Sequence, residues 1–198
     1  MQNSLSMSKA QRLTLLGLMT ALVVVLQLLG AFIRFGPFAV SLVLIPIVVG
    51  AALDGPLAGG WLGLVFGVVV LFTDAAGFMA ISIPGTVITV LFKGIAAGLI
   101  AGLVFRLIEK KNRWVAILAA AVVCPVVNTG VFFAGCYLFF FDVLSLSAAE
   151  AGKSLFLYII LVMIGANFLF ELLFNLALSP AALRLTDVGE KIFRNRKR

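Results

Sequence analysis

Long runs of apolar residues, separated by short stretches rich in polar residues, glycine or proline, make up most of this chain. An α-helix needs about 20 consecutive apolar residues to cross the hydrocarbon core of a bilayer. The pattern predicts six spans, at residues 12–33, 41–53, 57–72, 85–107, 114–141 and 154–183. The second is short for a full crossing and is interrupted by Pro46. The expected fold is an all-α membrane protein with six transmembrane helices in one compact bundle.

The segments that join these spans have the composition of turns and loops. Because glycine, proline and clusters of polar residues interrupt helices, we expect loops or turns at 34–38, 54–56, 73–84, 109–113 and 142–153. We expect one domain over residues 1–198, with the membrane bundle at 11–183 and a basic cytoplasmic tail at 184–198.

The overall composition supports a membrane location. The chain is 63% hydrophobic and 12% charged, whereas a soluble domain is about half apolar and about a quarter charged. The formal net charge of +7 could also suggest nucleic acid as a partner. The distribution of the basic residues argues instead for orientation in a lipid bilayer, and we expect no nucleic-acid partner.

Basic residues gather on one side of the predicted bundle. Six crossings put both termini on the same side, and twelve basic residues fall there: Lys9, Arg12, Arg106, Lys110, Lys111, Arg113, Arg184, Lys191, Arg194, Arg196, Lys197 and Arg198. The other side has Arg34 and Lys153. Since basic loops stay in the cytoplasm, both termini are predicted to be cytoplasmic.

The residue types that carry most enzyme chemistry are scarce. The chain has no histidine, which excludes Ser-His catalysis and histidine ligation of a metal. Its two cysteines, Cys124 and Cys136, lie on one predicted helix, too far apart to bridge each other. There is no Walker A motif for ATP. We therefore expect no catalytic residue, no metal and no cofactor.

A few polar residues lie inside the predicted spans. In the last span, Asn167, Glu171 and Asn175 are spaced four residues apart, so on a helix they form one stripe. An acid inside a membrane span is costly and faces the bundle interior or a watery cavity. The other polar residues predicted within the membrane are Gln27, Thr86, Thr89, Lys93, Asn128 and Thr129.

These polar residues point to a candidate site where three spans meet. Thr89 and Lys93 share one face of the fourth span, and Asn128 and Asn167 lie at comparable depth on the fifth and sixth. Two interpretations are open at this point. The groups form a structural network in which Lys93 pairs with Glu171, or they bind a small polar solute from outside, to which Asp74 and Phe78 in an outer loop could add contacts. We expect Asn175, near the cytoplasmic end, to be structural.

Small residues repeat at four-residue spacing on two spans and in a shorter form on the first. Gly55, Gly59, Gly63 and Gly67 form one ladder, and Gly94, Gly98 and Gly102 another. Such ladders let helix backbones approach closely, and packing within the monomer is the expected use. The shorter version, Gly17-xxx-Ala21, could dock a partner helix.

The architecture resembles a known family. Six short spans in about 200 residues, Gly17-xxx-Ala21, and the run Pro46…Asp54-Gly55-Pro56-Leu57-Ala58-Gly59 resemble the S component, the substrate-binding membrane subunit, of energy-coupling factor (ECF) transporters. The family usually has Ala-xxx-Ala in the first helix, and here Gly17 replaces the first alanine. The similarity covers essentially the whole chain and is stronger in architecture than in any exact motif.

The resemblance implies a function and partners. S components of a bacterial-type cell membrane capture a vitamin or related micronutrient from outside and associate with a transmembrane coupling subunit and two ATPases. They are thought to topple in the membrane to deliver the solute inward. Gly17 and Ala21 would then dock the coupling subunit. The two alternatives are a stand-alone small-solute carrier or channel, and a membrane scaffold that binds no ligand.

The resemblance also implies where the solute binds. The family builds its site from the loop after the first span, the fourth span, the loop before the sixth and the sixth itself. On this chain those segments contribute Arg34, Phe35, Thr89, Lys93, Glu150, Asn167 and Glu171. We add Asn128 because of its predicted depth in the membrane. Lys93 favours a solute with a carboxylate or phosphate, so we expect a pantothenate-like solute first and a riboflavin-like one second.

Overall fold

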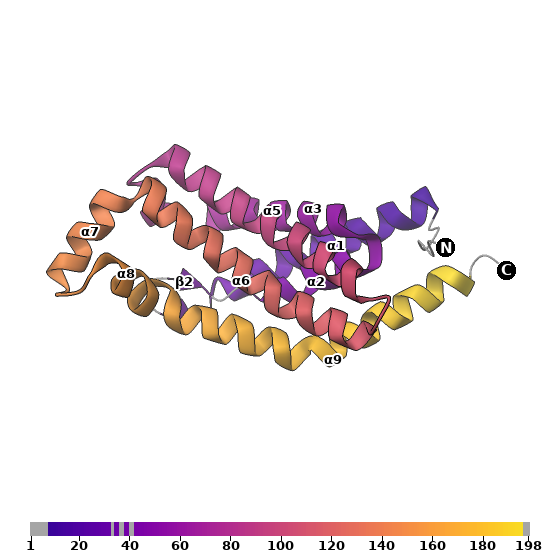
Figure 1. Cartoon of the computed structure of the whole chain (residues 1–198). Coiled ribbons are helices and arrows are strands. Elements are labelled where there is room, and N and C mark those ends of the chain that lie inside the picture. Colours follow the sequence, from indigo (N-terminus) through magenta and orange to yellow (C-terminus); the bar gives the residue numbers. More distant parts are fainter. Residues whose placement is uncertain (1–7, 33, 36–37, 40–41, 196–198) are drawn as a thin grey trace.

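The computed structural model of the chain describes residues 8–32, 34–35, 38–39 and 42–195. Most of them belong to helices that run lengthwise in one elongated bundle (Figure 1). In chain order the elements are α1 (Lys9–Gly30), β1 (Arg34–Phe35), β2 (Phe38–Ala39), α2 (Leu44–Asp54), α3 (Pro56–Thr73), α4 (Ala76–Met79), α5 (Ile83–Ile108), α6 (Arg113–Phe139), α7 (Phe141–Glu150), α8 (Leu155–Tyr158), the π-helix η1 (Ile159–Ile164) and α9 (Gly165–Asn195).

The predicted fold class, an all-α membrane bundle, is confirmed. Among the described residues, five helices are long and apolar enough to cross a membrane: α1, α3, α5, α6 and α9. The second predicted span, 41–53, contains the shorter α2. Its 11 residues reach only about 16 Å at the helical rise, so α2 is too short to cross the bilayer alone.

Capping residues define where the long helices begin. The side chain of Ser8 accepts a hydrogen bond from the backbone of Gln11 at the start of α1, and Ser82 and Asn112 do the same at the starts of α5 and α6. Between α2 and α3, Gly55 has φ of 98° and Pro56 follows as the first helical residue. A positive φ favours glycine, and proline suits the first turn of a helix. This chemistry explains the tight turn that reverses the chain.

The centre of the bundle is a backbone contact between α3 and α5. A Cβ atom placed on Gly63 would collide with the backbone carbonyl of Gly94, and one placed on Gly59 would collide with that of Gly98. The glycine ladders therefore serve packing within the monomer, as expected. The core around this contact is apolar and includes the fully buried Phe66 and Phe105.

The predicted loop at 142–153 is wrong, because most of it forms α7. Serine and alanine in this segment suggested a loop. Phe140, Leu144 and Ala148 are nevertheless spaced four residues apart and are all buried, which is the pattern of a helix packed on one face. The predicted loop at 73–84 likewise contains the single-turn helix α4. At 34–38, the described residues form part of a short antiparallel pair of strands, β1 and β2.

Most of the predicted basic tail is helical, since α9 continues through it to Asn195. Two contacts hold this part of the helix against the bundle. Arg113 Nε lies 3.0 Å from Asp187 Oδ1, and Thr186 is fully buried. The apolar content of residues 184–195 is low, so hydropathy alone ended the helix too early.

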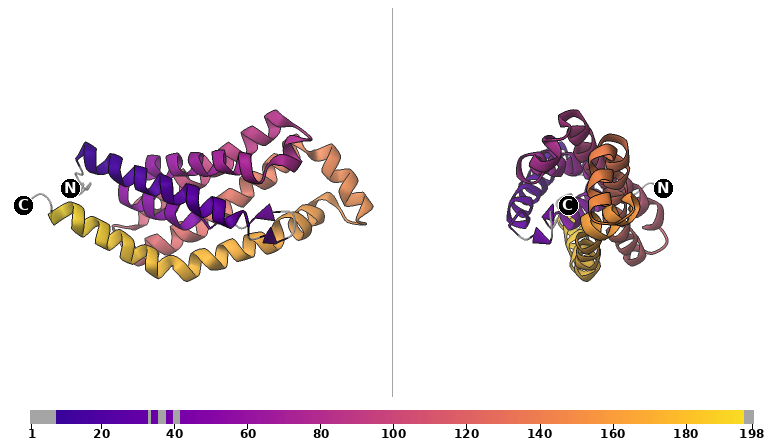
Figure 2. Two further views of the ribbon diagram at one scale, coloured as in Figure 1. Left: turned by 180° about the vertical axis from the view of Figure 1, so that it is seen from behind. Right: turned by 90° about the vertical axis from the view of Figure 1, so that its left-hand side faces the viewer.

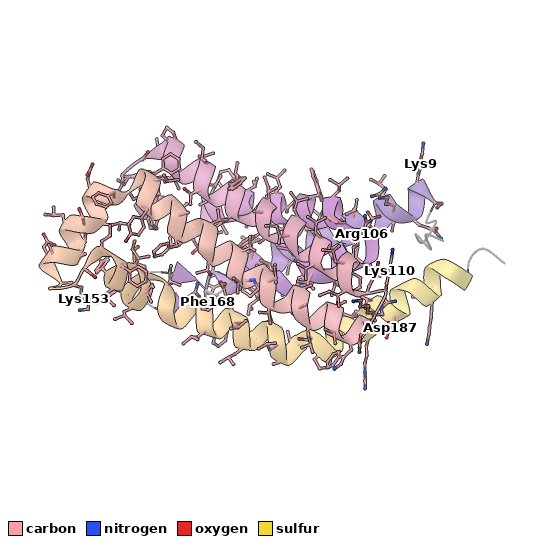
Figure 3. The ribbon with its side chains drawn as sticks, in the orientation of Figure 1. Lys9, Arg106, Lys110, Lys153, Phe168 and Asp187 are labelled. Atoms are coloured by element: carbon pink, nitrogen blue, oxygen red, sulfur yellow. The ribbon has the colours of Figure 1, made fainter. Side chains whose placement is uncertain are left out.

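Both ends of the described chain lie at the same end of the bundle (Figure 2). Lys9, Arg106 and Lys110 are found at this end, together with Asp187, whereas Lys153 lies at the opposite end (Figure 3). A second ion pair at the terminal end joins Arg12 Nε to Asp54 at 2.7 Å. The charge asymmetry predicted from the sequence therefore coincides with the two ends of the molecule.

The glycine contact predicts that a single methyl group at the right position destabilises the bundle. Gly63→Ala places its Cβ against the carbonyl of Gly94, and we expect the free energy of unfolding to fall by about 1–3 kcal/mol, the usual cost of overpacking. Gly130→Ala is the matched control, because nothing lies within 4 Å of a Cβ at Gly130. Thermal unfolding of the purified variants measures the difference. Equal melting temperatures for both variants would show that the contact does not limit stability.

Candidate functional site

A cavity lies among the helices. It encloses about 740 Å³ of space that no atom fills, part of it open to the outside. In Figure 3, one of its lining residues, Phe168, lies between the charged ends of the bundle. The other lining residues come from α1, α3, α4, α5, α6, η1 and α9, from the two residues before α4, and from Phe140 between α6 and α7. They are Gln27, Val70, Asp74, Ala75, Phe78, Thr86, Thr89, Val90, Lys93, Asn128, Thr129, Phe132, Phe140, Met163, Ile164, Asn167 and Glu171.

Five of the predicted site residues meet in this cavity: Thr89, Lys93, Asn128, Asn167 and Glu171. The structure does not bring Glu150 there. That residue ends α7 and is exposed. Arg34 and Phe35 form β1, but their side chains lie outside the described part of the structure.

Lys93 lies between two aromatic rings. Its Nζ atom is 5.6 Å from the centroid of Phe66 and 5.4 Å from that of Phe132, both within the range of a cation–π contact. Glu171 and Asp74 both act on Lys93 electrostatically. Lys93 and Glu171 thus line the same cavity and interact electrostatically, and both interpretations of this pair stay open.

The two acids of the cavity hold neighbouring amides. Gln27 Nε2 donates a hydrogen bond to Asp74 Oδ2 at 3.2 Å, which connects α1 to the end of α3. Asn167 Nδ2 donates to Glu171 Oε1 at 3.3 Å along α9. Thr73 Oγ1 also donates to Asp74, at 2.8 Å. Each acid thus orients at least one polar neighbour beside the cavity.

Several polar atoms around the cavity are buried and have no hydrogen-bond partner among the described residues. They are Gln27 Oε1, Thr89 Oγ1, Asn128 Oδ1 and Asn167 Oδ1. A buried polar atom without a hydrogen bond costs about 1–3 kcal/mol, and folded proteins contain few of them. Four such atoms around one cavity indicate a place where a polar molecule completes the hydrogen bonding.

Aromatic side chains form an apolar wall of the same cavity. Phe78 of α4 packs edge-on against Phe132 and Phe140, with centroid distances of 5.6 and 4.9 Å. Ligand sites are typically lined by apolar and aromatic groups with a few polar groups that fix orientation. The cavity has both parts, so its construction is that of a binding site for a small molecule.

Local packing explains why these side chains face the cavity. Thr86, Thr89 and Lys93 share the face of α5 next to the one that carries Gly94 and Gly98. Gly135 of α6 leaves the space that the Thr89 side chain occupies, since a Cβ there would collide with it. The close α3–α5 and α5–α6 contacts therefore hold the polar face of α5 at the cavity.

The site residues assigned from the family resemblance did not include Gln27 or Asp74, although Asp74 was expected to add contacts from an outer loop. Both carried a signal: Gln27 is the polar residue in the second half of an otherwise apolar span, and Asp74 closely follows another span. What the sequence lacked was the contact between them, which joins α1 to α3. The described residues contain no group of three or more Cys, Asp or Glu side chains that could hold a metal ion.

The small residues predicted to dock a partner lie on the outside of the bundle. Gly17 and Ala21 are both exposed on α1, and nothing lies within 4 Å of a Cβ placed on Gly17. Packing inside this chain therefore does not require glycine there. Exposed apolar side chains at Leu13 and Val25 extend the same face along the helix.

Comparison with known proteins identifies the family. A family described as "ECF transporter, substrate-specific component" matches residues 11–183, a range that contains every residue lining the cavity. Neither the curated proteins nor the solved structures give a match. Members of this family are substrate-binding subunits of transporters and not enzymes. The chain belongs to the substrate-specific components of ECF transporters, as its resemblance to the S component predicted.

Proposed function

We propose that the cavity binds a water-soluble, vitamin-like solute from outside the cell, and that Thr89, Lys93, Asn128, Asn167 and Glu171 contact it. The observation that carries this proposal is the gathering of unpartnered buried polar atoms around one cavity in a membrane bundle. A structural network would leave few such atoms, because its purpose would be to pair them. Arg34, Phe35 and Glu150 stay predictions from the family resemblance.

The chemistry of the cavity favours a solute with both polar and apolar parts. Lys93 can donate hydrogen bonds to a carboxylate or carbonyl, and Phe78, Phe132 and Phe140 can cover an apolar or flat part. A pantothenate-like solute is our first choice, because it combines a carboxylate with a branched apolar group. A riboflavin-like solute is second, because its ring system suits the aromatic wall.

The partners we propose are a transmembrane coupling subunit and two ATPases. Delivery then depends on them, because this sequence has no Walker A motif of its own. Gly17 and Ala21 form the docking surface, since small residues on a lipid-facing helix permit close approach of a second helix. Both termini, and with them the docking end of α1, face the cytoplasm of a bacterial-type cell membrane.

Lys93→Ala tests the site. We expect the affinity for an acidic solute to fall about tenfold or more, because removing one partner of a buried charge pair is strongly destabilising. The ligand is the molecule released from the gently purified chain and identified by mass spectrometry, and its affinity is measured by calorimetry. Lys153→Ala is the control, because Lys153 is exposed at the far end of the bundle. Unchanged affinity in Lys93→Ala would assign Lys93 to packing alone.

Ala21→Trp tests the docking surface. A large side chain at this exposed position should block a partner helix, so we expect transport to be lost while solute binding by the isolated chain stays unchanged. Leu103→Trp is the matched control, because Leu103 is 51% exposed on a different helix, α5. Uptake of labelled solute by cells that contain all the subunits is the measurement. Normal uptake by Ala21→Trp would remove Gly17 and Ala21 from the docking surface.

The orientation predicts which loops reach which side of the membrane. Lys110 lies at the end with the chain termini and Lys153 at the opposite end, and we replace each with cysteine in a separate variant. A membrane-impermeant thiol reagent added to intact cells should label Lys153→Cys and should label Lys110→Cys only after the membrane is opened. Cys124 and Cys136 are fully buried, so the unmodified chain serves as the background. Labelling in the reverse pattern would place the termini outside.

A further inference from the structure

Two amide side chains that line the cavity, Gln27 on α1 and Asn167 on α9, are each oriented by a hydrogen bond to a carboxylate. Gln27 donates its amide hydrogen to Asp74, and Asn167 donates its own to Glu171. An ionised carboxylate has no proton to donate, so it can hold an amide only through the NH₂ group. The acid therefore decides which way the amide faces and leaves the amide oxygen directed elsewhere.

Both of these amide oxygens are buried and lack a hydrogen-bond partner in the part of the chain that the structure describes. The Gln27 side chain belongs to a residue that is only 1% exposed, and neither Gln27 Oε1 nor Asn167 Oδ1 accepts a hydrogen bond. An amide oxygen can only accept. Its missing partner must therefore be a donor, and both amides line a cavity with room for one.

We infer that the solute of this cavity donates at least two hydrogen bonds, through N–H or O–H groups, to Gln27 Oε1 and Asn167 Oδ1. This inference rests on the proposed function, because it takes the cavity to be the solute site. Asp74 and Glu171 are positioning residues, which act by orienting the two amides. The class of solute is an amide, ureide, polyol or N–H-bearing ring.

Lys93 defines the third point of recognition. It lines the same cavity as both acid–amide pairs. An ammonium group has donors and no acceptor, so it requires a carbonyl or carboxylate from the solute. A solute that satisfies all three groups carries one acceptor together with two donors. A simple dicarboxylate satisfies Lys93 alone and leaves both amide oxygens unpaired.

A thermal-shift and calorimetry experiment on the full chain in lipid nanodiscs tests this inference. One group of probes, pantothenate, riboflavin, biotin and pyridoxine, carries two or more N–H or O–H donors on each molecule. A second group, nicotinate and glutarate at neutral pH, carries none. We expect binding from the first group only. Equally tight binding of nicotinate or glutarate would overturn the inference and leave the proposed function in place.

Variants connect the binding to the two amides. We expect Gln27→Met and Asn167→Leu each to weaken the binding of a donor-bearing probe about tenfold, the effect of one lost hydrogen bond to a buried group. Asn175→Leu is the matched control, because Asn175 is a buried asparagine on the same helix that does not line the cavity. If one variant fails to fold, the other carries the test.

The outcomes separate the two proposals. Unchanged affinity in both Gln27→Met and Asn167→Leu, with weaker binding in Lys93→Ala, would overturn the donor requirement and keep the solute site. An equal loss in Asn175→Leu would show a general effect of packing on α9 and would also overturn it. If no probe of either group binds, the proposed function fails, and the inference fails with it.

Discussion

The close backbone contact between α3 and α5 is the constraint on which the rest of the structure depends. Gly63 and Gly94 pack main chain against main chain so closely that a Cβ on either residue would collide with the carbonyl of the other. Lys93 directly precedes Gly94, so its position follows from the same contact. Thr89, one turn earlier, then fits against Gly135 of α6. The glycine contacts between neighbouring helices therefore determine where the polar groups of the cavity lie.

The polar groups obey a second constraint, the cost of leaving hydrogen bonds unmade away from water. Capping residues satisfy helix ends, and Ser179 and Thr186 donate to carbonyls of their own helix at 2.9 and 2.7 Å. These side chains are satisfied within their own helix. Among the described residues, a buried polar atom without a hydrogen bond also occurs away from the cavity, at Asn175 Nδ2, but four of them gather around it, which supports the proposed ligand.

Local signals explain most of what the sequence could predict. Hydropathy located the long spans, and the four-residue spacing of Thr89 and Lys93 was enough to place them on one face of a helix. In the segment that forms α7, serine and alanine suggested a loop despite the four-residue spacing of Phe140, Leu144 and Ala148, and the π-helix η1 has no comparably strong local signal. Contacts between distant segments were the other limit: the Gln27–Asp74 hydrogen bond joins two helices, and no spacing rule connects them. Glu150 was assigned through the family resemblance, and the helical path of α7 leaves it exposed.

The distribution of charge supports the proposal that this chain needs a partner to move its solute inward. The sides of the bundle expose apolar residues such as Leu22, Ile88 and Leu173, whereas Lys9, Lys110 and Lys153 occupy its ends. Rotation of the whole bundle would bring these ends toward the hydrocarbon, at about 2.5–3.5 kcal/mol for each charged side chain at the membrane centre. Ion pairs such as Arg12–Asp54 lower this cost at one end. In the proposed function, another protein surface covers the remaining charges, and Gly17 and Ala21 lie on the helix that begins at that end.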